Sequence, residues 1–408
     1  MSHIVSMGTY LPPWRDGARR VKGPDEDALT MAVAAGRAAD PDASAQRVVL
    51  VSRDFPLLEG GNAGVLLAGL SLRADIPVTE VLGGAPAALD QLVAGAEGTL
   101  VVAADDALAG VGAAAALMGA DGTGVEVAEV GRQNRSLPVM ARGGDGARHE
   151  YADPRLQREI GVRATLAQLG LTAPSVVAVS AGVKAAQLGR DFDTSAAVDD
   201  PAASAASVIR LVADAIESGT SGLVLAIEQS TVTAARLELG AAPPRITRDE
   251  VDPHELPVTR IAEGVGIPIS LAAYARAFEP KLRWEAAMFE ERPGIDAAPQ
   301  FPPRARVDNS GNLATDYRLE PLPRTGTVYT YTTIRIPVPD LPSPYSLAIV
   351  SLDDSPVRVL LKVTGVPAGE VSIGQPGSVI LRKIATRSGI PDYGYAFWPG
   401  RTTEGTRA

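Results

Sequence analysis

Carboxylates that follow apolar runs are the residues of this chain best suited to acid–base chemistry. Asp105 and Asp106 follow the run 99–104, and Glu228 follows the run 223–227. Such runs predict buried strands, and α/β proteins often place functional groups where these strands end. A carboxylate there can act as a general base, or it can cap the helix that comes next. Both interpretations stay open for Asp105 and Glu228.

Histidine is the other side chain that exchanges protons near neutral pH, and the chain holds three of them. His3 lies near the terminus, whereas His149 and His254 lie in polar, charged stretches. Surface positions are the simpler interpretation of all three. His149, which has acidic neighbours in sequence, is the strongest acid–base candidate among them.

Four further side chains are candidates for substrate binding. Lys184 could contact a phosphate of coenzyme A, or it could lie on a solvated face. Tyr329 and Tyr331 share one face of a predicted strand, and Tyr345 begins another. Aromatic residues at such places either fill the core of a small barrel or bind a ligand at its strand surface.

The chain contains no cysteine. Sulfur as a thiolate is the acyl-carrying nucleophile of many enzymes and the main ligand of structural zinc. The sequence therefore excludes acyl capture on sulfur and any cysteine-ligated zinc site. Asp308 and Asn309 fall far short of the oxygen ligands of a calcium loop. We expect no metal and no resident cofactor, with a coenzyme A thioester as a possible substrate.

Charge and hydropathy exclude several other classes of function. The net charge of −10 argues against a nucleic-acid surface. The longest apolar stretch, 107–120, is too short and too rich in Ala and Gly to span a bilayer. The first residues lack the pattern of a secretory signal. We expect a cytoplasmic protein that binds neither nucleic acid nor membrane.

The pattern of the elements changes twice along the chain. Residues 1–240 alternate apolar runs with Ala-rich helical periods, which predicts an α/β domain whose sheet is covered on both faces. Residues 241–325 are rich in Pro and charge and predict a connector, with one helix over 271–290 kinked at Pro280. Residues 326–400 hold about five short strands separated by Gly and Pro, typical of an OB-type barrel. Residues 401–408 form a polar tail.

The first domain resembles the thiolase superfamily, closest to 3-hydroxy-3-methylglutaryl-CoA synthase-like proteins. Residues 8–12 are similar to that family's G-x-Y-x-P start, and 23–32 to its G-E-D-x-x-T-M-A segment. Residues 110–117 are similar to its G-D-G-A-A-A segment, with Val111 in place of Asp. The resemblance implies a duplicated α/β fold. It also implies that the chain associates with a second copy of itself or with a related thiolase subunit.

The catalytic residues of that family do not carry over to this chain. Its nucleophilic Cys corresponds to Ala85 and Pro86, in the turn 81–89, and its His to Val179. Its Glu falls near Ser52 and Arg53. Acyl transfer needs an activated nucleophile and a base within reach, so the family's mechanism cannot operate here.

The last domain resembles an acyl-CoA-associated OB-fold family, which normally carries a zinc ribbon before its barrel. The strand 324–332 is similar to that family's G-x-V-Y-T-Y-T motif, and 344–353 to its P-Y-x-x-A-x-V-x-L-D segment. The segment 307–311 is similar to a C-P-x-C-G zinc knuckle from which both cysteines are lost. We therefore expect a degenerate zinc-ribbon remnant within 241–325.

Three functions fit these observations. The first is a non-catalytic or weakly catalytic subunit of an acyl-CoA-processing complex, which supplies a scaffold and an acyl or coenzyme A channel to a thiolase partner that carries the cysteine. The second is a Cys-independent enzyme acting on carbon–carbon bonds, such as a retro-aldolase or an acyltransferase-like enzyme. The third is a small-molecule-binding tailoring component that does not contact coenzyme A.

Overall fold

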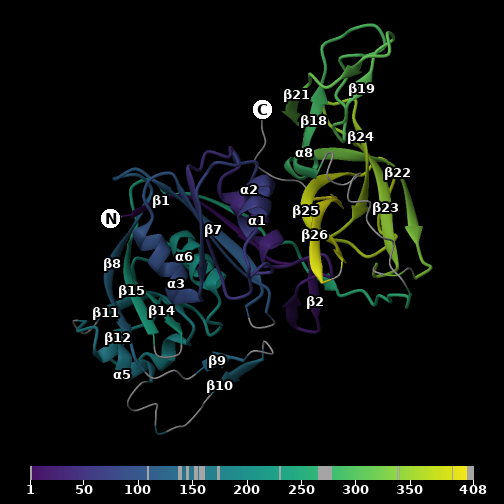
Figure 1. Cartoon of the computed structure of the whole chain (residues 1–408). Coiled ribbons are helices and arrows are strands. Elements are labelled where there is room, and N and C mark those ends of the chain that lie inside the picture. The colour runs from purple at the N-terminus through teal and green to yellow at the C-terminus, as the bar shows by residue number, and fades with distance from the viewer. Residues whose placement is uncertain are drawn as a thin grey trace. The chain divides into compact units, whose positions relative to one another are not determined.

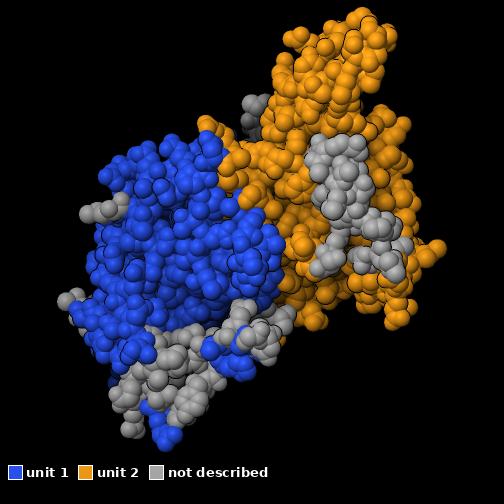
Figure 2. Space-filling view, viewed as in Figure 1, with its two compact units in different colours: residues 1–12, 31–63, 75–251 blue, residues 13–30, 64–74, 252–408 orange. Residues whose placement is uncertain are grey.

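The computed structural model describes residues 2–401 except 108–109, 137–139, 144–146, 151–154, 156–160, 172–174, 229–230, 265–277, 338, 340 and 388. The chain forms two compact units (Figure 2). Unit 1 comprises Met1–Pro12, Met31–Ala63 and Asp75–Val251, and unit 2 comprises Pro13–Thr30, Gly64–Ala74 and Asp252–Ala408. No helix among the described residues has the length and apolar character needed to cross a membrane.

Unit 1 is built on a 12-stranded sheet (Figure 1). The first half of the unit supplies β1 (Ser2–Tyr10), β4 (Arg47–Ser52), β5 (Val78–Leu82), β6 (Thr99–Asp105) and β7 (Gly112–Gly119). The second half supplies β8 (Val125–Asn134), β11 (Ser175–Ala181), β13 (Val198–Asp200), β14 (Gly222–Glu228) and β15 (Thr231–Glu238). Two short strands complete the sheet, β12 (Phe192–Asp193) beside β11 and β16 (Arg245–Asp249) beside β1. A separate hairpin joins β9 (Met140–Arg142) and β10 (Arg148–Glu150).

The two halves of unit 1 repeat one strand order. From the middle of the sheet outward, the first half runs β1-β7-β6-β4-β5 and the second runs β8-β15-β14-β11-β13. Each half thus places its first strand innermost, then its fifth, fourth, second and third. The halves meet where β1 pairs with β8 in antiparallel fashion. This order confirms the predicted duplicated, thiolase-like α/β fold.

Helices cover both faces of the sheet, as the continuous apolar strands predicted. The central helices α3 (Ala85–Ala94) and α6 (Ala205–Glu217) lie side by side (Figure 1) and share one core with alternate residues of β14, Val224 and Ala226. The intervening residues Leu223 and Leu225 face the other core, which α5 (Val162–Ala167) helps to form. Helices α1 (Ala28–Ala39) and α2 (Asn62–Leu70) follow β3 and β4 in the chain.

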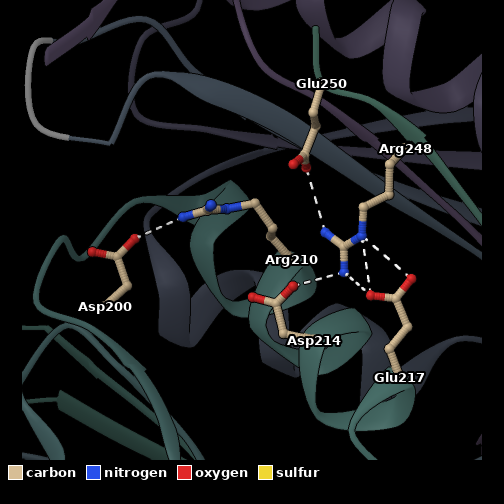
Figure 3. Close-up of polar contacts among 6 residues, drawn as sticks. All are labelled: Asp200, Arg210, Asp214, Glu217, Arg248 and Glu250. Carbon is tan, nitrogen blue, oxygen red and sulfur yellow. Dashed lines mark hydrogen bonds and ion pairs between the residues drawn. The ribbon is translucent and has the colours of Figure 1, made fainter. Parts of the chain in front are cut away.

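An ion-pair network ties α6 to β16 (Figure 3). The Arg248 guanidinium binds Asp214 and Glu217 of α6, each through a nitrogen–oxygen distance of 2.6 Å, and Glu250 at 3.4 Å. Burial alone would lower the pKa of Arg248, but the hydrogen bond with Glu217 and the charges of Asp214 and Glu250 raise it above its usual value. Arg248 therefore stays charged and fixes the helix against the sheet.

Unit 2 contains the predicted barrel. Its strands are β22 (Thr325–Ile334), β23 (Tyr345–Leu352), β24 (Arg358–Val363), β25 (Pro376–Arg387) and β26 (Ile390–Pro399). They close in the order β22-β23-β24-β26-β25, with β22 pairing β25 and with β24 parallel to β26. A five-stranded closed barrel with one parallel pair has the OB topology, so the prediction of an OB-type barrel is confirmed.

Short elements precede the barrel in unit 2. A three-stranded sheet joins β2 (Trp14–Asp16), β3 (Arg19–Val21) and β17 (His254–Glu255). Helix α8 (Phe278–Arg283) is followed by β18 (Glu285–Met288), which pairs with β21 (Arg318–Pro321), and a small hairpin joins β19 (Arg306–Val307) and β20 (Leu313–Ala314).

The predicted helix over 271–290 is wrong in its second half. Residues 271–277 lie outside the described part of the chain. The described helix ends at Arg283, and Trp284 has a φ of 62°, in the left-handed region that stops a helix. The Trp284 side chain is buried against Phe301 and Tyr395, so tertiary packing of the aromatic ring overrides the helical period of the sequence.

The acidic segment 25–27 is bound by residues of the barrel. Asp25 accepts a hydrogen bond from the Thr364 hydroxyl at 2.6 Å, and Asp27 accepts one from the Tyr393 hydroxyl at 2.8 Å. Between them, Glu26 forms an ion pair with Arg382, which is 1% exposed. Three consecutive carboxylates therefore connect an early segment of the chain to the barrel of unit 2.

Candidate functional site

The turn that corresponds to the nucleophile position is closed. Helix α3 begins at Ala85, with Pro86 in its first turn and Gly84 as the preceding cap residue. Ala85 is fully buried, and its backbone N–H donates to the Ala203 carbonyl at 3.4 Å. Pro86 has no N–H that could contribute to an oxyanion hole. The turn therefore offers neither a nucleophile nor this hydrogen-bond donor to an acyl group.

Val179, the position expected by resemblance to match the family's histidine, lies in the hydrophobic core. Val179 is in the middle of β11 and is fully buried. It belongs to the same core cluster as Ala85. The structure thus places Ala85 and Val179, the positions that the resemblance aligns with a nucleophile and a histidine, in one packed interior.

Asp105, Arg53 and Glu228 meet beside this turn at the ends of β6, β4 and β14. The Arg53 guanidinium binds the Glu228 carboxylate at 3.2 Å, and its Nε lies 4.0 Å from Asp105 Oδ2. The backbone N–H of Arg53 donates to Asp105 Oδ1 at 2.8 Å, and the N–H of Ala205 donates to Oδ2. Two of the carboxylates singled out from sequence therefore share one arginine.

The environment of Asp105 suits a structural carboxyl group. Its side chain is fully buried, and burial raises the pKa of Asp105 to about 7 against the lowering effects of the Arg53 and Ala205 hydrogen bonds. Both carboxyl oxygens accept backbone N–H groups, one of them from the first residue of α6. Asp105 is not the cap residue of a helix that follows it, because β7 comes next and α6 has Ser204 as its own N-cap, but its carboxyl group does bind the first N–H of α6.

Glycines let the chain approach closely around these carboxylates. A Cβ on Gly84 would overlap the Glu228 carboxylate and the Ala203 carbonyl. Gly182, at the end of β11, has a φ of 93° and leaves no room for a side chain against the Ile227 carbonyl. Backbone carbonyls and the Glu228 carboxylate therefore fill the space beside Gly84 and Gly182.

The remaining candidates in unit 1 lie apart from this cluster. His149 is exposed on β10, and Lys184 is exposed just after β11. His3 accepts a hydrogen bond from the N–H of Gly122 at 3.3 Å. In unit 2, His254 lies on β17 with its ring centroid 6.2 Å from that of Trp14.

The three tyrosines proposed for binding fall into two environments of the barrel. Tyr329 and Tyr331 on β22 are 51% and 39% exposed, and Arg358 stacks over the Tyr329 ring at 3.8 Å. Tyr345 instead lines a cavity of about 390 Å³ in unit 2. Sequence reasoning did not single out Lys362 or Asp25, which line the same cavity. The available signal for Lys362 was a charge inside the apolar strand 358–363.

Hydrogen bonds stabilise the turn at 307–311, the segment that resembles a zinc knuckle without its cysteines. Asp308 accepts the backbone N–H groups of Ser310 and Asn312 at 2.8 and 2.9 Å, and these bonds, led by that from Asn312, lower its pKa. Val307 and Ser310, at the two cysteine positions, provide no thiolate, so these residues do not fit a zinc ion. Among the described residues, no three His, Cys, Asp or Glu side chains converge as a metal site.

The barrel matches a known family over part of its length. Residues 319–378 match the family described as ChsH2, C-terminal OB-fold domain. The match runs from β21 into β25 and thus includes the first three strands of the barrel. No curated protein matches this sequence significantly.

Several solved structures align with parts of this chain at low identity. The 3-oxoacyl-(acyl carrier protein) synthase III, FabH, from Pseudomonas aeruginosa PAO1 is 17% identical and aligns over 59% of this chain and 98% of its own, with a TM-score of 0.45. An HMG-CoA synthase complexed with CoA is 12% identical over 59% of this chain and 82% of its own, with a TM-score of 0.45. The Ltp2-ChsH2(DUF35) aldolase is 20% identical over 33% of this chain and 100% of its own, with a TM-score of 0.26.

The thiolase-like assignment of unit 1 follows from its own repeated strand order, and the OB assignment of unit 2 from its barrel. The chain thus joins a thiolase-like α/β fold to a barrel similar to the ChsH2 C-terminal OB-fold domain.

Proposed function

We propose that this chain is a non-catalytic subunit of an acyl-CoA-processing assembly in which a thiolase-family partner supplies the nucleophilic cysteine. The observation that carries this proposal is the closed turn at Ala85, which shares one hydrophobic core with Val179. In such a thiolase-like fold, the residues at both catalytic positions are buried in the core and cannot react with a substrate. The outer surfaces of the fold stay available for binding a partner. The acyl-CoA thioester is then a ligand of the assembly, and this chain needs no resident cofactor.

The edge of the sheet supports a role in assembly. Strand β5 ends the sheet and pairs only with β4 among the described residues, so one row of its backbone groups faces outward. Leu82 at the end of this strand is 69% exposed. An exposed edge with an apolar residue is a template for pairing with another strand, and a two-fold copy of the same edge satisfies it. The expected partner at this edge is a second copy or a related thiolase subunit.

Acyl labelling tests the absence of chemistry. We expect the purified full-length chain, incubated with [14C]acetyl-CoA, to retain no more acid-stable label than a heat-denatured sample, because no thiolate or exposed nucleophile lies at the turn. A cysteine-containing thiolase treated in parallel provides the positive control. Turnover of acetyl-CoA or acetoacetyl-CoA by this chain alone would overturn the proposal.

Substitution at the sheet edge tests the assembly surface. We expect the wild-type chain to sediment with a mass above its monomer mass of 42.2 kDa, and Leu82→Lys to return it to the monomer. A lysine on an edge strand disfavours pairing because its charge would have to be desolvated in the new sheet. Val176→Lys, at a 50% exposed position on β11 toward the other end of the sheet, is the matched control. A wild-type monomer, or equal dissociation by both variants, would rule out self-association through β5.

A further inference from the structure

The cavity of unit 2 has the size and lining of a small-molecule site. Its volume is about 390 Å³, within the range of ligand pockets in proteins. Apolar side chains dominate the lining, among them Trp14, Pro257, Val363 and Ile384. An apolar wall with few polar groups favours a ligand that is mostly hydrocarbon and carries one reactive or polar centre.

Lysines are rare in this chain, and two of them line this cavity. The sequence has 38 Lys and Arg residues, of which only five are lysines: Lys22, Lys184, Lys281, Lys362 and Lys383. The first three are exposed, whereas Lys362 and Lys383 are half-buried and line the cavity. Arginine carries the positive charge nearly everywhere else, so the primary amines are concentrated at this site. An amine can form a covalent bond with a carbonyl group, which a guanidinium does not do under ordinary conditions.

Lys362 lies on β24, beside Leu347 of β23 and Ala396 of β26. Its Nζ is 5.4 Å from the centroid of the Tyr345 ring. The carboxylate that faces it, Asp25, accepts the Thr364 hydroxyl at 2.6 Å and lies 3.9 Å from the Arg382 Nε. None of the described residues forms an ion pair with Lys362 within 4 Å. The amine therefore faces the cavity with little charge compensation.

Burial of Lys362 also disfavours the charged form of its amine. Desolvation lowers the pKa of Lys362 below its usual value, and the charge of Asp25 opposes the shift without cancelling it. The other titratable groups on the cavity wall are Lys383 and the Tyr345 phenol. A larger fraction of Lys362 is thus unprotonated at neutral pH than of an exposed lysine, and the unprotonated amine is the nucleophile.

We propose that this cavity is a carbonyl-binding site in which the Lys362 amine condenses with an apolar aldehyde or ketone. The nitrogen lone pair adds to the carbonyl carbon, and a proton moves from nitrogen to oxygen to give a carbinolamine. The oxygen then takes a proton from the solvent and leaves as water while the nitrogen lone pair forms a carbon–nitrogen double bond, and the remaining N–H proton returns to the solvent. Amine and carbonyl give imine and water, and no oxidant or reductant is consumed. This site is independent of the assembly role proposed for unit 1.

Reductive trapping tests the site in the wild-type chain. The full-length protein is incubated at pH 7 with hexanal or 2-octanone and sodium cyanoborohydride, which reduces an imine to a stable secondary amine. Peptide mass spectrometry then gives the rate of modification at each of the five lysines. We expect Lys362 to be modified faster than Lys22, Lys184 and Lys281, because its pKa is lowered by desolvation and its amine lines the cavity that would hold the carbonyl compound.

Two variants and one competition separate the site from general amine reactivity. Lys362→Arg should abolish the fast modification, whereas Lys383→Arg should leave it in place. The unreactive alcohol 2-octanol should slow modification of Lys362 in the wild-type chain and leave the exposed lysines unaffected. Modification of Lys362 no faster than of the exposed lysines would overturn the proposal, and so would fast modification that 2-octanol does not slow. Neither result would affect the acetyl-CoA labelling experiment.

Discussion

Glu26→Ala is expected to destabilise unit 2 by about 3–5 kcal/mol, the usual cost of removing one partner of a buried ion pair. Glu26 is fully buried, and its Oε1 lies 3.2 Å from the Arg382 Nη2. Its second oxygen accepts the Gly23 N–H at 2.7 Å. Alanine would leave the Arg382 guanidinium, which is 1% exposed, beside a void in place of its nearer carboxylate, with Asp25 at 3.9 Å from its Nε still beside it. The loss is large because the charge cannot be rehydrated without opening the barrel.

Tryptophan fluorescence isolates this effect, because all three tryptophans, Trp14, Trp284 and Trp398, lie in unit 2. Urea unfolding followed by fluorescence should show the midpoint of Glu26→Ala far below that of the wild type. Glu279→Ala serves as the control, because it removes a 63% exposed partner of Arg283 in the same unit and should cost at most about 1 kcal/mol. Equal effects of the two substitutions would show that the Glu26–Arg382 pair does not stabilise unit 2.

The barrel was predictable because its strands carry local signals. Alternating β-branched and aromatic residues bounded by Gly and Pro placed strands over 327–336 and 345–352, and the structure has them at Thr325–Ile334 and Tyr345–Leu352. The role of the acidic segment 25–27 was not predictable in this way. Asp27 and Tyr393 are 366 positions apart, and no short-range pattern relates residues at that separation. Such contacts depend on the closed fold as a whole.

In the candidate site, too, local features were predictable from the sequence and long-range contacts were not. The sequence placed Asp105 and Glu228 at strand ends, and the structure has them as the last residues of β6 and β14. Their meeting at Arg53 follows from the duplicated sheet, in which the fourth strands of both halves point their ends toward the central helices. Strand periodicity carries no information about which side chains from two halves share a partner. Lys362 was missed because one charge in an apolar strand is read as a snorkelling surface residue.

Asp105→Ala is expected to destabilise unit 1 by about 2–5 kcal/mol, because it leaves two buried N–H groups without their acceptor at about 1–3 kcal/mol each. The two donors belong to Arg53 and Ala205. Asp105→Asn keeps one carbonyl oxygen and should lose less. Hydrogen–deuterium exchange of peptides that cover β6 and α6 reports unit 1 directly. A loss of protection confined to these peptides, with unchanged tryptophan fluorescence, is the expected result, and unchanged exchange would contradict the role of Asp105 as the acceptor of these N–H groups.

The contribution of Asp105 to the free energy of unfolding is expected to decrease as the pH rises. Burial raises the pKa of Asp105 to about 7, above the value near 3.9 that an unfolded chain has, so the folded state binds the proton more tightly. The stabilisation due to protonation is complete below pH ~4 and is lost as the pH rises to about 7, with a slope of at most about 1.4 kcal/mol per pH unit. The stability difference between wild type and Asp105→Asn should therefore decrease from pH 5 to pH 7 and level off above that range. Other titrating groups cancel in this difference, because the two proteins share them. If the difference instead increased with pH, Asp105 would be ionised throughout, and its two N–H donors and Arg53 would outweigh the cost of burial.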